Sequence, residues 1–100
     1  MHQHIVFFWM KDGVDATQRA GFVQALEALC KEPNIAEARF GTPADTNRDV
    51  VDNSYDYALV LGFETLAAHD RYQNESAIHD QFIATGKALW ERVLVYDVNV

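Results

Sequence analysis

The sequence predicts an α+β protein with the ferredoxin-like element order β-α-β-β-α-β and an antiparallel sheet. Two observations lead to this fold class. Short apolar segments rich in β-branched and aromatic residues alternate, in that order, with segments whose apolar residues recur at helical spacing. The chain also has only 100 residues, and two domains of about 50 residues would each lack an adequate core. We therefore expect a single domain over residues 1–100.

Four segments are expected to be strands. Residues 4–10 form an almost continuous apolar run, as in a strand that is covered on both faces. Residues 55–63 alternate large and small apolar side chains and give the clearest strand signal, whereas residues 35–41 are short and partly polar and indicate an edge strand. The polar segment 42–54 is expected to be a loop, and residues 92–100 form the last strand.

Two regions are expected to be helical. Apolar side chains recur at helical spacing in residues 16–31, so one stripe of this helix is buried. Asp15 is its expected N-cap, and Gln18 stands three residues later, as in a capping box. The second region covers residues 66–72 and, after a polar break, resumes over residues 77–91.

Apolar side chains also lie on the sheet face that the helices leave uncovered. This face carries Ile5, Phe7, Trp9, Ala58 and Val60. A contiguous apolar patch of several hundred Å² in water usually marks an interface. We therefore expect a homodimer in which two sheets pack face to face, giving a dimeric α+β barrel.

Composition excludes several classes of partner. A net charge of −7 argues against nucleic-acid binding and against an anionic membrane surface. No apolar run approaches the roughly 20 residues that span a bilayer, and the glycines form no phosphate-binding loop, so no cofactor is expected. Cys30 is the one cysteine and has no partner for a disulfide within the chain. The expected location is the cytoplasm.

Histidine and tyrosine are the residues that could carry chemistry. His4 lies on an apolar strand face and His79 in the second helical region, so the two could exchange protons in a dry pocket. Tyr72 lies at the helix break and could donate a hydrogen bond to a developing oxyanion. The competing interpretation of His4 and His79 is that they are core histidines held by backbone carbonyls. His2 and His69 are expected to be structural.

A metal site is not expected, because no tight ligand motif such as HExxH is present. The alternative that the sequence leaves open is a set formed by His2, His4 and His79 with an acid such as Asp80 or Asp97.

Four segments together resemble a known family. They are HIVFFWMK, YDYALVLGFETLAAHDRY, AIHDQF and LWERVLVYDV, and in this order they are similar to the Dabb family, the stress-responsive α/β-barrel domains. The family hallmark H-P-A-H-x-x-F is only partly retained: His79 and Phe82 match it, whereas its first histidine and proline are absent and one residue is inserted after Tyr72.

The resemblance implies a dimeric barrel and a set of site residues. A plant polyketide cyclase of the family acts by aldol condensation without a cofactor, and the resemblance places its two histidines and its tyrosine on His4, His79 and Tyr72. Its apolar pocket falls on Val23, Leu26, Leu59, Phe82 and Trp90. Val6, Phe8 and Tyr57, on the same strand faces as His4 and Leu59, complete the expected binding residues.

Three functions follow as hypotheses. The first is a small stress-responsive homodimer that binds a small apolar molecule without a demonstrable reaction. The alternative is a cofactor-free acid–base enzyme, a polyketide cyclase or related lyase, that uses His4, Tyr72 and His79. The third is a cofactor-independent monooxygenase, which rests on fold analogy alone.

Overall fold

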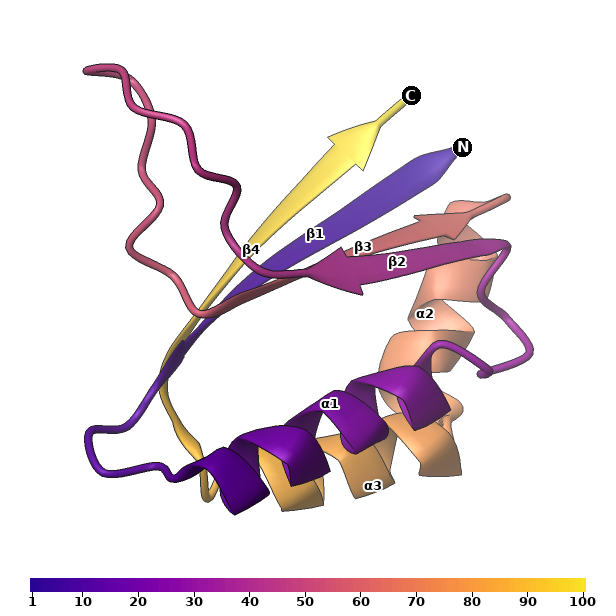
Figure 1. Ribbon diagram of the computed structural model, residues 1–100. Helices are drawn as coiled ribbons and strands as arrows, with labels where there is room; N and C mark the ends of the chain where they lie inside the picture. Colours follow the sequence, from indigo (N-terminus) through magenta and orange to yellow (C-terminus); the bar gives the residue numbers. More distant parts are fainter.

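The computed structural model describes residues 1–100 and contains four strands and three helices (Figure 1). In chain order they are β1 (His2–Met10), α1 (Ala16–Leu29), β2 (Glu37–Gly41), β3 (Tyr57–Phe63), α2 (Leu66–Glu75), α3 (Ala77–Gly86) and β4 (Trp90–Asn99). The strands form one antiparallel sheet in the order β2-β3-β1-β4. The predicted ferredoxin-like fold is therefore confirmed.

Capping residues define where the helices begin. The Asp15 side chain accepts a hydrogen bond from the Gln18 backbone, and the Gln18 side chain accepts one from the Asp15 backbone, which is the predicted capping box. Thr65 caps α2 and Ser76 caps α3 in the same manner, each accepting a backbone N–H.

Several predicted boundaries were wrong. The helix expected over residues 77–91 ends at Gly86, and Trp90 begins β4 instead of closing the helix. Its side chain joins an aromatic group with Phe8 and Phe82, at centroid distances of 5.4 and 5.9 Å. Tertiary packing thus overrides the helical spacing there. The other elements differ from their predicted ranges by up to three residues at an end.

The two faces of the sheet have different surroundings. α1 and α3 lie side by side across one face, and α2 lies toward one end of it (Figure 1). Because strand side chains alternate, the helix-facing residues are the buried ones, and they include Val6, Phe8, Leu59 and Leu61. No helix covers the other face, where Phe7 packs against Tyr55 and Tyr96.

The helices are short by the standard of a bilayer. α1, the longest, has 14 residues, and none is both long and apolar enough to cross a membrane.

Candidate functional site

A cavity of about 310 Å³ lies between the helices and the sheet. Many of the residues predicted for the site line it: His4, Val6, Phe8, Leu59, Tyr72, His79, Phe82 and Trp90. Gln73, Ile83, Val93 and Val95 complete the wall, and the sequence analysis did not identify them. Val93 and Val95 could have been found, since they pair with Phe8 and Val6 across the β1–β4 ladder. The wall is mainly apolar and carries few polar groups, which is typical of small-molecule sites.

Three of the predicted binding residues are not part of this wall. Leu26 and Tyr57 are buried in the core, and Val23 packs against that core from α1. The ring of Tyr57 lies 5.2 Å from that of Phe22. Tyr57 pairs with Phe8 in the β1–β3 ladder, whereas His4 pairs with Leu61, nearer the other end of the two strands. Their apolar character is explained by core packing.

Tyr72 brings the two predicted histidines into one neighbourhood. Its ring centroid lies 6.1 Å from that of His4 and 4.6 Å from that of His79, in edge-on arrangements. His4 comes from β1, whereas Tyr72 is in α2 and His79 in α3. The three side chains therefore face one cavity, although no hydrogen bond joins them directly.

The break between α2 and α3 determines where His79 points. Ser76 has an extended backbone (φ −85°, ψ 117°), so it ends α2 and starts a new helix instead of continuing the old one. His79 lies in the first turn of the new helix, and its side chain is buried against the cavity.

His79 is a buried histidine with an unused nitrogen. Its Nδ1 atom has no hydrogen-bond partner. Burial lowers the pKa of this imidazole and outweighs the charges of Asp80 and Glu32, which act to raise it, while His69 acts with the burial. His79 is therefore neutral at neutral pH and can accept or donate one hydrogen bond at Nδ1, according to its tautomer.

Tyr72 keeps its proton. Burial is the main cause that raises the pKa of its phenol, and the charge of Glu32 adds to it. The hydroxyl group is therefore available as a donor at any physiological pH.

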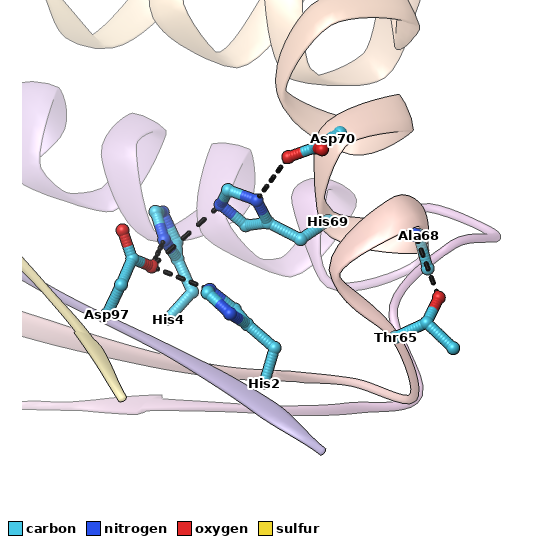
Figure 2. A network of polar contacts seen from close by, with 7 residues as sticks. All are labelled: His2, His4, Thr65, Ala68, His69, Asp70 and Asp97. Carbon is cyan, nitrogen blue, oxygen red and sulfur yellow. Dashed lines mark hydrogen bonds and ion pairs between the residues drawn. The ribbon is translucent and has the colours of Figure 1, made fainter. Parts of the chain in front are cut away.

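A second group of polar side chains lies next to the cavity, at one end of β1 (Figure 2). Asp97 of β4 accepts hydrogen bonds from His2 Nε2 at 2.8 Å and from His4 Nδ1 at 2.7 Å, both at its Oδ1 atom. His69 of α2 points at the same oxygen, with its Nε2 atom 3.8 Å away. Its other nitrogen, Nδ1, lies 3.1 Å from Asp70. We call His2, His4, His69 and Asp97 the histidine cluster.

The charge of Asp97 and its hydrogen bonds indicate which ring nitrogens of His2 and His4 carry a hydrogen. Partial burial acts to raise the pKa of the Asp97 carboxyl, but hydrogen bonds from His4 and His2 outweigh it and lower the pKa. An ionised carboxylate can only accept, so the nitrogens that contact Asp97 carry hydrogen. Burial lowers the pKa of His4 despite the opposing effect of Asp97, so His4 is neutral, with its hydrogen on Nδ1.

Sequence reasoning favoured structural places for His2 and His69, and the metal set that it left open grouped His2 and His4 with His79 and either Asp80 or Asp97. His79 is not a member of the histidine cluster, whereas His69 is. The cross-strand pair His4–Asp97 follows from the β1–β4 register, which cannot be read from the sequence. The position of α2 over β1 adds His69, whose ring lies 5.0 Å from that of His4.

Comparison with known proteins supports the fold and defines the family. Residues 3–100 match the family described as Stress responsive A/B Barrel Domain, or Dabb. The chain belongs to the Dabb family. Among curated proteins there is no match in sequence.

Solved structures similar to this Dabb chain include proteins with and without an assigned activity. A dimeric ferredoxin-like protein of unknown function from Thermobifida fusca has 20% identity and a TM-score of 0.80, over 99% of this chain and 90% of its own. A Dabb family protein from Mesorhizobium loti has 20% identity and a TM-score of 0.78, over 99% and 95%. The hydroxynitrile lyase from Passiflora edulis has 20% identity and a TM-score of 0.80, over 99% and 92%. At these identities the likeness establishes the fold.

Proposed function

We propose that this Dabb protein is a homodimer that binds, in the cavity of each subunit, a small apolar molecule carrying one carbonyl or hydroxyl group. The observation that carries the proposal is the buried Nδ1 atom of His79, which has no partner within the chain. A buried polar atom without a hydrogen bond costs about 1–3 kcal/mol. A ligand oxygen that reached this atom from the cavity, after a small rotation of the His79 ring, would remove this cost, and the apolar wall would hold the remainder of the molecule.

The volume limits the size of the ligand. At about 310 Å³, the cavity lies at the lower end of the range of about 300–1,000 Å³ found for small-molecule sites. Compact molecules with one ring or a short chain suit this volume. A charged ligand does not, because the wall offers no charged partner to offset its desolvation.

The dimer is proposed to form through the uncovered sheet face. Ile5, Phe7, Trp9, Ala58 and Val60 are only half-buried within one subunit. Similar structures are described as dimeric, and packing of two sheets would remove this apolar surface from water.

Acid–base catalysis is the second candidate, and one observation favours it. The neutral imidazole of His79 lies beside the protonated phenol of Tyr72, at a ring distance of 4.6 Å. His79 would take a proton from the carbon next to a bound carbonyl, and Tyr72 would donate a hydrogen bond to the enolate oxygen. One relative in fold is a hydroxynitrile lyase. The monooxygenase hypothesis rests on the fold alone, and a shared fold does not carry an activity.

Two probes of the same shape test binding. 4-Phenylbutan-2-one carries a carbonyl that butylbenzene lacks, and their affinities can be measured by ¹H–¹⁵N NMR titration. We expect the ketone to bind about fivefold more tightly, since a hydrogen bond contributes about 1 kcal/mol. His79→Leu and Tyr72→Phe should each reduce the preference. Equal affinity of wild type for both probes, or the same preference in both variants, would contradict the proposal.

The same ketone separates binding from chemistry. In D₂O, proton abstraction replaces the hydrogens next to the carbonyl by deuterium, and ¹H NMR follows their loss. Acid–base activity predicts exchange with wild type that His79→Ala reduces by about 10²-fold or more. If the ketone binds but its hydrogens exchange no faster than in buffer, the protein binds the ketone without catalysing proton abstraction.

A further inference from the structure

We propose that the histidine cluster is a binding site for a divalent transition-metal ion of the zinc class, held by His2, His4, His69 and Asp97. The cluster provides three imidazole nitrogens and one carboxylate oxygen, and these atoms all lie within 4.8 Å of one another. The inference does not depend on the proposed function, because the unused nitrogen of His79 belongs to a different group of residues.

The geometry is close to that of a tetrahedral site. With metal–ligand distances of about 2.0–2.1 Å, neighbouring ligand atoms are separated by about 3.3 Å. In the structure, Asp97 Oδ1 lies 2.8 Å from His2 Nε2, 2.7 Å from His4 Nδ1 and 3.8 Å from His69 Nε2. These three values bracket the required separation, and no two of the four ligand atoms are more than 4.8 Å apart. Side-chain movements of about 1 Å would therefore bring all four to tetrahedral spacing.

His69 gives the strongest indication. Its Nδ1 atom lies 3.1 Å from the Asp70 carboxylate, which can only accept, so the hydrogen belongs on Nδ1. The Nε2 atom is buried, has no hydrogen-bond partner and lies 3.8 Å from Asp97 Oδ1. An ion between this nitrogen and the carboxylate would give both atoms a partner.

Asp70 is positioned to orient His69 as a metal ligand without binding the metal itself. Metal-binding histidines commonly donate the N–H of the ring nitrogen that does not bind the metal to a carboxylate, which sets the tautomer and orients the ring. His2 and His4 present a lone pair to an ion when their ring hydrogen is on the other nitrogen. Without an ion, His2 Nε2 and His4 Nδ1 donate hydrogen bonds to Asp97. With an ion, the same two nitrogens would bind the metal.

The ligand types and the access route define the kind of ion. Imidazole nitrogen suits zinc and its transition-metal neighbours, whereas Ca²⁺ and Mg²⁺ require mostly oxygen ligands. Asp97 is about half-exposed, with 45% of its side chain accessible. It also borders, together with His2 and Glu64, an open hollow of about 400 Å³ that leads to solvent. An ion can enter there without unfolding of the sheet.

Zinc binding to the full chain, without a polyhistidine tag, tests the proposal. After treatment with EDTA and dialysis, the protein is titrated with ZnCl₂ in competition with a chromogenic chelator. We expect one zinc per chain. His69→Gln should weaken binding by about 100-fold, and Asp70→Asn, an exposed change that leaves all four ligands, by about 10–100-fold.

His79→Ala is the matched control, because it removes the one histidine outside the cluster. It should leave the zinc affinity unchanged, and Co²⁺ should give the intense visible absorption of a four-coordinate ion with wild type but not with His69→Gln. Failure of wild type to compete for zinc would overturn the proposal. Unchanged affinity in His69→Gln would overturn it as well, since zinc would then bind elsewhere. Neither result bears on ketone binding by the cavity.

Discussion

Replacement of Gly86 by alanine tests whether packing against Trp90 governs the end of α3. Alanine in a helix is ordinarily more stable than glycine by about 0.8–1 kcal/mol. Gly86 does not have a positive φ, so its backbone presents no obstacle to a side chain. A Cβ atom at this position would, however, lie 2.1 Å from Trp90 Cζ3 and 2.7 Å from Cε3.

The magnitude follows from what surrounds the indole ring. Trp90 packs against Phe8, Phe22 and Phe82 at ring distances of 5.4, 6.3 and 5.9 Å, so it has little room to move away. Overpacking of this kind costs about 1–3 kcal/mol, and the gain in helix propensity offsets about 1 kcal/mol of that cost. We expect Gly86→Ala to lower the free energy of unfolding by up to about 2 kcal/mol. For a chain of this size that corresponds to several degrees in Tm.

Urea denaturation followed by circular dichroism measures the change, at one protein concentration because a dimer dissociates on unfolding. Gly21→Ala is the matched control: Gly21 lies inside α1, is exposed, and has no atom within 4 Å of the added Cβ. It should raise the free energy of unfolding by about 1 kcal/mol. If Gly86→Ala stabilises the protein as much as Gly21→Ala does, the packing explanation is wrong.

Three further predictions concern the cap, the dimer and pH. Asp15→Ala removes the capping box of α1 and should lower the free energy of unfolding by about 0.5–2 kcal/mol in the same urea assay. Phe7→Asp places a charge on the uncovered sheet face, and native mass spectrometry should then detect the 11.3 kDa monomer in place of the proposed dimer, with the circular dichroism spectrum retained. The folded-state pKa of His79 lies below its usual value of 6.5, so the unfolded chain binds the proton more readily. This contribution to stability is complete above pH 6.5 and decreases as the pH falls from there through the folded-state pKa. In EDTA, His79→Leu should reduce the loss of stability between pH 7.5 and 5, and an identical pH dependence in this variant would exclude His79 as its source.

Local patterns were sufficient to predict most of the fold. The two-residue period of a strand divided the residues of β1 and β3 into two faces, because neighbouring side chains of a strand must point to opposite sides of the sheet. The Asp15–Gln18 spacing placed the start of α1 for an equally local reason. Trp90 was assigned to the wrong element because its place depends on aromatic partners in β1 and α3 that are distant in the chain.

The candidate site divides in the same way. Sequence alone singled out His4, Tyr72 and His79 as candidates for acid–base chemistry, from their residue types and from the family resemblance. Only the tertiary structure decided that Asp97 and His69 meet His4, because that contact depends on the β1–β4 register and on where α2 packs against the sheet. Periods of 2 and 3.6 residues determine which face a side chain occupies within its own element. They carry no information about which residue of another element it will face.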